Sequence, residues 1–283
     1  NVLREFMRPL FVGSLTVSTV RVAIRDLPGR LEGCRIVQLS DFHYDGQRLS
    51  DRLLRQVVDR VNSLEPDLIA LTGDYVTCDP APIFALAAYL SQMQSRFGTV
   101  AVLGNHDNIT VGGRQTILRS LRQAGIQALW NDIAYPLGTD FPVVGLAEFW
   151  SRDFHPAPVL DLLPSTQPRL VLCHNPDTAE LLAPWRVDLQ LSGHTHGGQI
   201  VLPGLGPAPA ITQGLRQGLA DWLPFDLPYL SRNCLKIVRH WEWVSGLHAV
   251  GQNQLYVNRG LGTYAPGRWR CPPEVTVVEL VGG

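Results

Sequence analysis

Short apolar runs alternate along this chain with longer segments in which apolar residues recur every three or four positions. A short apolar run between turn residues is typical of a buried strand, and the longer spacing is typical of a helix with one buried face. The pattern predicts strands at residues 16–24, 35–39, 67–72, 99–103, 126–130, 143–147, 170–173, 187–191, 199–202, 255–258 and 275–280. It predicts helices at residues 50–64, 83–93 and 115–124. This alternation, with more sheet in the second half, indicates a layered α/β protein.

The helix that follows Ser50 has the clearest periodicity. Ser50 is a suitable N-cap, because its hydroxyl can accept a hydrogen bond from a free N–H of the first turn. Pro66 ends the pattern. The apolar residues that form one face of this helix are Leu53, Leu54, Val57, Val58, Val61 and Leu64.

Five of the predicted strands are followed by a short polar cluster rich in His, Asp and Asn. The clusters are Asp41-Phe42-His43, Gly73-Asp74, Gly104-Asn105-His106-Asp107, His174-Asn175 and Gly193-His194-Thr195-His196. Open α/β sheets place their ligands at the carboxyl ends of strands, so we expect these clusters to meet. Together they supply enough nitrogen and oxygen donors for two metal ions. A donor set without sulfur suits Mn, Fe, Zn or Co better than Ca or Mg.

The spacing within the clusters fits such a site. His194 and His196 are one residue apart, and in a loop each can reach a different metal ion. Gly73 allows a close backbone approach and leaves the carboxylate of Asp74 free to bridge two cations. Asn105 supplies a neutral oxygen and limits the negative charge. The other three histidines, His155, His240 and His248, belong to no cluster.

Composition excludes some other classes of protein. The 283 residues, of which 45% are apolar, can fill a substantial core. The formal net charge of −1 provides no general attraction for nucleic acid, so an anionic substrate has to be attracted locally. The five cysteines show no C-x-x-C spacing, and we interpret them as core residues rather than as a disulfide framework.

The two ends of the pattern suggest how the chain is divided. Residues 1–32 are interpreted as a lead-in and an edge strand, and residues 33–283 as the main domain. The apolar start around residues 6–15 is interrupted by Arg8, Pro9 and Gly13 and is shorter than the ~20 residues that span a bilayer, so it lies at most on a membrane surface.

A long irregular excursion is expected at residues 203–251, directly after the last cluster. Long irregular segments in compact domains are often functional. Its tryptophans either cover an apolar part of a substrate or simply pack onto the domain. They are Trp222, Trp241 and Trp243.

The five clusters, in this order, resemble the signature of the calcineurin-like metallophosphoesterases. The resemblance covers residues from about 33 to 281 and implies a four-layer αββα sandwich of two mixed sheets. The chain is more similar to the membrane-associated bacterial branch of YkuE-like and YaeI-like phosphoesterases, which includes a UDP-diacylglucosamine pyrophosphatase. The segments that carry this closer similarity are residues 38–43, 191–199, 256–262 and 272–275. The excursion at 203–251 is longer than is usual in that branch.

The resemblance also implies roles for individual residues. One metal ion is held by Asp41, His43, Asp74 and His196, and the other by Asp74, Asn105, His174 and His194. Asp74 therefore bridges, and a hydroxide between the two divalent ions is the nucleophile that attacks phosphorus.

The remaining implied roles concern the substrate. His106 donates to the phosphoryl oxygen or the leaving group, and Asp107 orients the His106 ring. Arg259 and Arg268 are candidate phosphate ligands.

The expected function is therefore metal-dependent hydrolysis of a phosphodiester or pyrophosphate, with a small-molecule or lipid-linked substrate and peripheral contact with a membrane surface. Two alternatives stay open. One is a phosphomonoesterase, and the other is a non-catalytic interaction platform on the same fold. The intact set of ligand positions argues against the second alternative.

Overall fold

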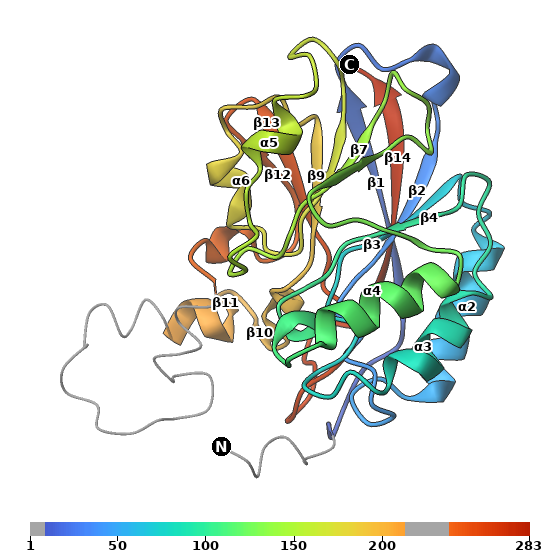
Figure 1. The fold of residues 1–283 in the computed structure, drawn as a ribbon. Coiled ribbons are helices and arrows are strands. Elements are labelled where there is room, and N and C mark those ends of the chain that lie inside the picture. Colours follow the sequence, from blue (N-terminus) through green and yellow to red (C-terminus); the bar gives the residue numbers. More distant parts are fainter. Residues whose placement is uncertain (1–8, 213–237) are drawn as a thin grey trace.

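The computed structural model describes residues 9–212 and 238–283, which form four layers (Figure 1). Two six-stranded sheets pack face to face, and helices cover both outer faces. The strand orders are β1-β14-β2-β3-β4-β5 and β12-β13-β9-β8-β7-β6. The αββα sandwich of two mixed sheets is thereby confirmed.

The first sheet combines both ends of the chain with its first half. Its strands are β1 (Thr16–Ile24), β14 (Glu274–Gly282), β2 (Arg35–Leu39), β3 (Leu68–Leu71), β4 (Thr99–Ala101) and β5 (Gln127–Ala128). Strands β2 to β5 run parallel, and β14 lies antiparallel to β2. β1 is the edge strand and pairs in parallel with β14 along its whole length. The helices α2 (Asp51–Ser63), α3 (Ile83–Leu90) and α4 (Gly113–Gln123) cover the outer face.

The second sheet contains β12 (Gly246–Val250), β13 (Asn253–Val257), β9 (Leu189–Ser192), β8 (Leu170–Leu172), β7 (Val143–Gly145) and β6 (Asp132–Ala134). Its four central strands are parallel, and both edge strands are antiparallel to their neighbours. The short helices α5 (Ala157–Leu160) and α6 (Thr178–Leu181) lie on its outer side.

Alternate residues of each strand face different cores. In β2, Ile36 belongs to the core between the sheets, whereas Val37 and Leu39 belong to the core beneath the helices. In β8, Leu170 and Leu172 face the other sheet and Val171 faces the helix side. Because both faces of each sheet are covered, these strands are apolar throughout, which is why they stand out in the sequence.

Helix α2 begins as predicted. The Ser50 hydroxyl oxygen accepts a hydrogen bond from the backbone N–H of Leu53 at 3.3 Å. The buried face consists of Leu54, Val57, Val58 and Val61. The helix ends at Ser63, and Glu65 adopts a left-handed conformation before Pro66.

Some predicted elements differ in extent. The strand predicted at 199–202 is only β10 (Val201–Leu202), which pairs with β11 (Gly206–Pro207) in a small hairpin. The predicted excursion at 203–251 ends in the regular strand β12 and also contains the 3-10 helix η4 (Trp241–Trp243). Strands β6 and β12 and helices α5 and α6 were not predicted, because three to five residues give too little periodicity.

One tryptophan of this stretch shows which of the two expected roles it has. Trp243 packs against a cluster that includes buried Leu255 and Val257, and its ring stacks on His240 at 4.1 Å. Trp243 therefore packs onto the domain. Trp222 lies outside the described residues. Within the described ranges, no helix has both the length and the apolar character needed to span a bilayer.

Candidate metal centre

The five polar clusters converge where the carboxyl ends of strands from both sheets meet. Asp41, Asp74 and Asn105 follow β2, β3 and β4, whereas His174 and His194 follow β8 and β9. Three groups of side chains bring ligand atoms within 4.8 Å of one another. The groups are Asp41, His43 and His196; His43, Asp74 and His106; and Asp74, His174 and His194.

Five of the predicted ligands occupy left-handed backbone conformations. Their φ values are 51° for Asp41, 42° for His43, 55° for Asp74, 72° for His194 and 52° for His196. Residues other than glycine seldom adopt positive φ, and the strain persists only where surrounding structure enforces it. Because five predicted ligands share this strained conformation, we infer that the turns at the strand ends direct these side chains toward one another.

Two motif glycines permit this close approach. A Cβ atom on Gly104 would overlap the carboxylate of Asp74 and come within 2.6 Å of its backbone nitrogen. A Cβ atom on Gly193 would overlap the side chains of Ser40 and Asp41. The glycines of the Gly-Asn-His-Asp and Gly-His-x-His motifs are thus required because neighbouring loops touch their backbone.

Asp74 lies at the centre of the cluster and is 1% exposed. Its Oδ2 atom is 3.4 Å from Nε2 of His43 and 3.2 Å from Nε2 of His174. Its Oδ1 atom accepts a hydrogen bond from the backbone N–H of His106 at 2.8 Å. Asp74 therefore belongs to two of the three ligand groups, and one of its oxygens lies close to a histidine of each.

Some of the atoms that could bind a metal ion are buried without a hydrogen-bond partner in the protein. Nδ1 of His174 donates to the carbonyl of Thr72 at 2.7 Å, so Nε2 is the ring nitrogen directed at the cluster. The side-chain oxygen of Asn105 and Nδ1 of His196 are buried without a hydrogen-bond partner. A buried acceptor without a partner is costly. A cation beside the Asn105 oxygen would supply the missing partner. The nitrogen and oxygen atoms of the cluster therefore fit divalent metal ions.

The electrostatics of the cluster agree with this fit. Burial raises the pKa of Asp41 to about 6 and lowers the pKa of His43 and of His196 well below 6.5. Burial also opposes the charge on Asp74, yet the nearby His174 and His106 rings hold the pKa of Asp74 well below its usual value. The Asp74 carboxylate in turn outweighs burial and raises the pKa of His174 to about 10. Imidazoles bind metal in their neutral form, so a cation at this position would displace the proton of His174.

The structure corrects the role predicted for Asp107. Nδ1 of His106 donates to the carbonyl of Thr77 at 2.7 Å, so this carbonyl holds the ring. The Asp107 carboxylate accepts hydrogen bonds of 2.8 to 3.3 Å from four backbone N–H groups, those of Asp74, Tyr75, Val76 and Gly104. The prediction that Asp107 orients the His106 ring is wrong, because both carboxylate oxygens fasten the loops after β3 and β4 together.

The two arginines predicted to contact phosphate have protein acceptors in this structure. The guanidinium of Arg259 bonds to the carboxylate of Glu274 at 3.1 Å and to the hydroxyls of Thr16 and Ser18. Arg268 is 4% exposed and donates to several backbone carbonyls, including those of Gly262, Gly260 and His196. Both guanidinium groups stabilise the protein itself, since their donors are directed at protein acceptors.

Two aromatic residues beside the cluster were missed in the sequence. The hydroxyl of Tyr264 lies 2.9 Å from Nδ1 of His43, and the Arg48 guanidinium lies over the Tyr264 ring at 5.0 Å. Trp150 is 47% exposed, and its ring lies edge-on to His194 at 5.2 Å. One signal in the sequence points to Trp150, namely that it follows shortly after β7, a central strand of the second sheet.

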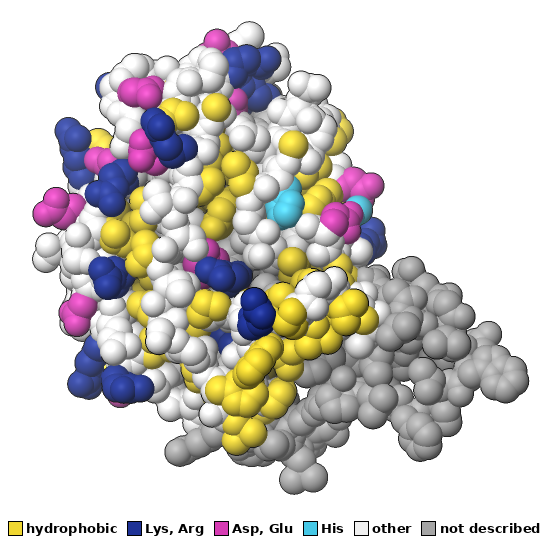
Figure 2. Space-filling view, turned by 180° about the vertical axis from the view of Figure 1, so that it is seen from behind, with side chains coloured by type: hydrophobic (Ala, Val, Ile, Leu, Met, Phe, Trp, Pro, Cys, Tyr) yellow, Lys and Arg dark blue, Asp and Glu magenta, His cyan; other side chains and the backbone are white. Residues whose placement is uncertain are grey.

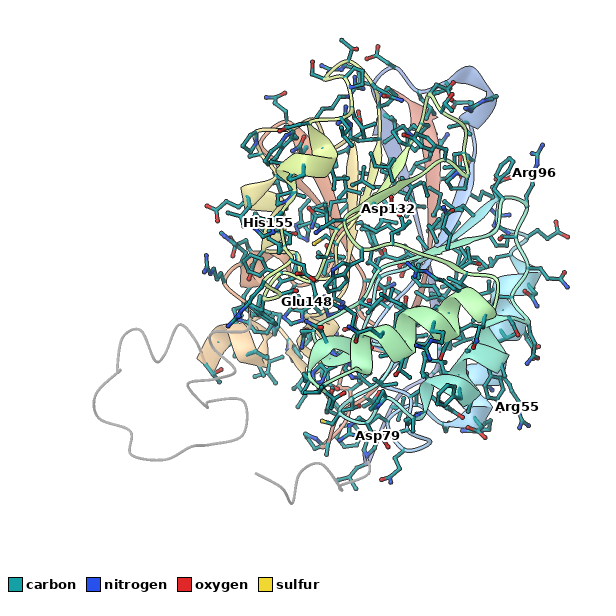
Figure 3. The ribbon with its side chains drawn as sticks, in the orientation of Figure 1. Arg55, Asp79, Arg96, Asp132, Glu148 and His155 are labelled. Atoms are coloured by element: carbon teal, nitrogen blue, oxygen red, sulfur yellow. The ribbon has the colours of Figure 1, made fainter. Side chains whose placement is uncertain are left out.

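Glu148 explains how Trp150 is held. Its carboxylate accepts a hydrogen bond from the backbone N–H of Trp150 at 2.9 Å. Glu148 is 3% exposed and lies toward the middle of the molecule, unlike Arg55 and Arg96 at the edge (Figure 3). Burial raises the pKa of Glu148.

The fold and the cluster of Asp, His and Asn donors define a metal-dependent hydrolase domain. The family model of the calcineurin-like phosphoesterases matches residues 34–198. This chain belongs to the calcineurin-like phosphoesterase family and is an enzyme that hydrolyses phosphoester bonds. Its family membership and enzyme class are therefore as predicted from the motifs.

Three relatives match most of the chain. It is 34% identical over 255 residues to phosphodiesterase YaeI of Escherichia coli strain K12, covering 87% of this chain and 82% of YaeI. It is 30% identical over 299 residues to the UDP-2,3-diacylglucosamine pyrophosphatase LpxG of Chlamydia muridarum, covering 89% and 84%. It is 32% identical over 265 residues to the metallophosphoesterase YkuE of Bacillus subtilis strain 168, covering 90% and 81%.

The contacts of Asp107 lead to the first prediction. Asp107→Ala leaves four backbone N–H groups without their acceptor, so we expect the free energy of unfolding to fall by about 3 kcal/mol or more. Metal content should fall with it. Urea denaturation and metal analysis of the purified variant measure both, and Asp59→Ala, at an exposed carboxylate of α2, is the matched control. Unchanged stability and metal content, with only a slower reaction, would contradict this role.

Proposed function

We propose that this enzyme uses two divalent metal ions to hydrolyse a phosphodiester or pyrophosphate bond in a lipid-linked substrate. The observation that carries the proposal is the carboxylate of Asp74, whose Oδ2 atom lies close to Nε2 of both His43 and His174. A carboxylate between two groups of neutral donors is suited to bridge two cations about 3.5–4 Å apart.

The ligands divide into two sets on this proposal. One ion is held by Asp41, His43, Asp74 and His196, and the other by Asp74, Asn105, His174 and His194. Bound divalent cations activate water at neutral pH and offset negative charge on the phosphoryl oxygens. The nitrogen and oxygen donors suit Mn, Fe, Zn or Co.

His106 is proposed as the protein group that acts on the substrate. Nδ1 is used by the Thr77 carbonyl, which leaves Nε2 to donate to a phosphoryl oxygen or to the leaving group. Burial lowers the pKa of His106 but the Asp74 carboxylate more than compensates, so that its pKa is raised to about 9. The Asp74 carboxylate thus favours the protonated form of the ring, as a proton donor requires.

The substrate class rests on the relatives. One is named a phosphodiesterase and another a UDP-2,3-diacylglucosamine pyrophosphatase. We infer a substrate with a phosphodiester or pyrophosphate centre and an apolar portion, and peripheral contact of the enzyme with a membrane surface. The exposed ring of Trp150 is available to contact the substrate beside the reacting phosphate.

The second prediction concerns the bridge. Asp74→Ala should remove both metal ions together, because each site loses a shared anionic ligand, whereas Asn105→Ala should mainly remove one. Metal per chain, measured after desalting, distinguishes the two variants. Near-full occupancy of both sites in Asp74→Ala would rule out the bridging assignment.

The third prediction concerns His106. His106→Ala should keep its metal ions while the rate falls by roughly 10²–10⁴, the span typical of a positioned acid. The ring also lies in one of the three ligand groups, so metal content must be measured with the rate. Parallel loss of metal and activity would make His106 a ligand instead.

The fourth prediction tests the substrate class. The metal-loaded enzyme should hydrolyse bis(4-nitrophenyl) phosphate faster than 4-nitrophenyl phosphate, and a UDP-linked diacyl sugar faster than either, as measured by initial rates. Preference for the monoester would make the enzyme a phosphomonoesterase. Full metal occupancy without hydrolysis of any of the three would favour a non-catalytic interaction platform.

A further inference from the structure

Five large apolar side chains are exposed on adjoining segments and form a surface that we call the apolar face. Their exposed fractions are 78% for Leu10, 43% for Phe11, 37% for Leu202, 69% for Leu205 and 54% for Trp269. The rings of Phe11 and Trp269 are in edge contact at 6.3 Å. Figure 2 shows hydrophobic side chains gathered on this side of the molecule, with cationic side chains next to them. Exposed apolar surface of this size marks an interaction site more often than chance.

Backbone hydrogen bonds hold the three segments of the apolar face together. The N–H of Leu10 donates to the carbonyl of Pro266, and the N–H of Arg268 donates to the carbonyl of Phe11, both at 2.9 Å. The N–H of Val201 donates to the carbonyl of Trp269 at 3.0 Å. The face is therefore a fixed platform built from the N-terminal segment, the β10–β11 hairpin and the loop before β14.

The same segments lead directly into the metal centre. The N–H of Trp269 donates to the carbonyl of Gln199 at 2.8 Å, and the Gln199 side chain accepts from the N–H of Tyr264 at 2.8 Å. Tyr264 contacts His43, and Gln199 follows the 3-10 helix η3 (His196–Gly198). The apolar face is thus connected to the metal centre through two hydrogen bonds and the Tyr264 side chain.

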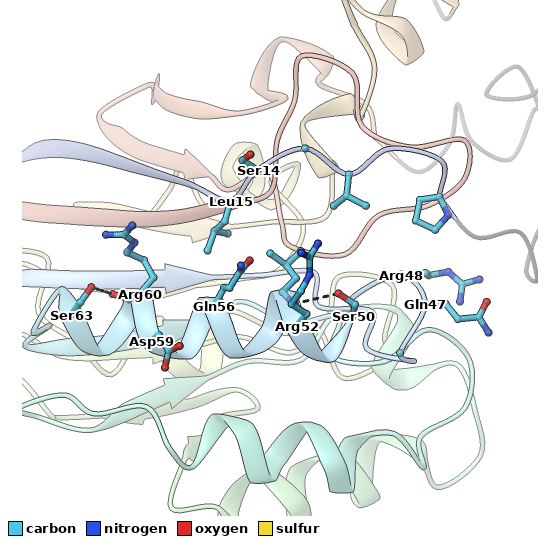
Figure 4. A pocket seen from close by; sticks show the side chains of 15 residues that line it. Ser14, Leu15, Gln47, Arg48, Ser50, Arg52, Gln56, Asp59, Arg60 and Ser63 are labelled. Atoms are coloured by element: carbon cyan, nitrogen blue, oxygen red, sulfur yellow. Dashed lines mark hydrogen bonds between the residues drawn. The ribbon is translucent and has the colours of Figure 1, made fainter.

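The N-terminal segment also borders a cationic groove, which supplies charge complementarity. The groove has a volume of about 880 Å³ and lies between residues 9–15 and helix α2 (Figure 4). Arg48, Arg52 and Arg60 line it, and Asp59 is the one acidic residue among its lining. Arg52 and Arg60 are exposed and form no ion pair with any residue of 9–212 or 238–283.

We infer that the apolar face and the cationic groove together dock the enzyme onto an anionic phospholipid bilayer. This inference rests on the proposed function, because a lipid-linked substrate resides in such a surface. Exposed apolar side chains beside the exposed Arg52 and Arg60 match the two contributions to interfacial membrane binding, namely burial of apolar area and attraction to anionic headgroups.

Vesicle flotation of the full chain tests the inference. The two vesicle types are phosphatidylcholine alone and an equimolar mixture of phosphatidylcholine and phosphatidylglycerol. Leu205→Ser combined with Trp269→Ser should weaken binding to both types by about tenfold or more. Arg52→Gln combined with Arg60→Gln should remove only the additional binding that phosphatidylglycerol provides, because that part is electrostatic.

Matched controls keep the result interpretable. Leu162→Ser removes a leucine that is 72% exposed next to α5, away from the apolar face, and should leave binding unchanged. Leu205→Ser alone serves if the double variant fails to fold. All face variants should hydrolyse bis(4-nitrophenyl) phosphate at the wild-type rate, since that substrate is soluble.

Three outcomes would overturn the inference. The first is absence of wild-type binding to either vesicle type, and the second is binding by the face variants equal to that of Leu162→Ser. The third is a wild-type dimer in light scattering that the face variants convert to monomer, which would make the face an interface between two copies. Failure of the wild type to hydrolyse any phosphodiester would instead contradict the proposed function and leave the docking result standing.

Discussion

The structure depends on holding carboxylates and imidazoles within a few ångströms of one another where water is excluded. Asp41, His43 and Asp74 are almost fully buried, and charged groups in such surroundings are costly unless they are paired or bind metal. The protein meets part of this cost itself, through four backbone N–H groups on Asp107 and one on Asp74. The side-chain oxygen of Asn105 has no partner in the protein, and a bound cation would supply one.

This constraint explains why the site lies between two sheets. A single strand end supplies one or two ligands, and the first sheet carries the acidic donors while the second carries His174 and His194. The buried amide of Gln38 in β2 connects the sheets, because its Nε2 donates to the Thr72 hydroxyl at 3.0 Å and to the Ser192 carbonyl at 2.8 Å. The relative position of the ligand loops is therefore fixed by polar contacts just behind them as well as by the apolar core between the sheets.

The sequence predicts the parts of this arrangement that depend on local pattern. Strands buried on both faces give apolar runs, and each run ends in a ligand motif, so the layered fold and the convergence of the clusters follow from the chain alone. Contacts between distant segments leave no such pattern. The pairing of β1 with β14 could not be predicted for this reason. Nor could the hydrogen bonds of Arg259 to Glu274 and of Arg268 to backbone carbonyls, because the sequence around an arginine is the same whether it binds substrate or protein.

The same distinction separates the chemistry of the enzyme from its choice of substrate. The ligands lie on strand-end turns whose left-handed conformations and close packing permit almost no variation. The residues around them, such as Trp150 and Tyr264, lie on loops between strands and are exposed or half-buried. Loops tolerate change far better than buried turns. A rigid centre can therefore keep one phosphoester chemistry while its rim adapts to a different leaving group or surface, and for this reason substrate identity in this chain has to be sought at the rim.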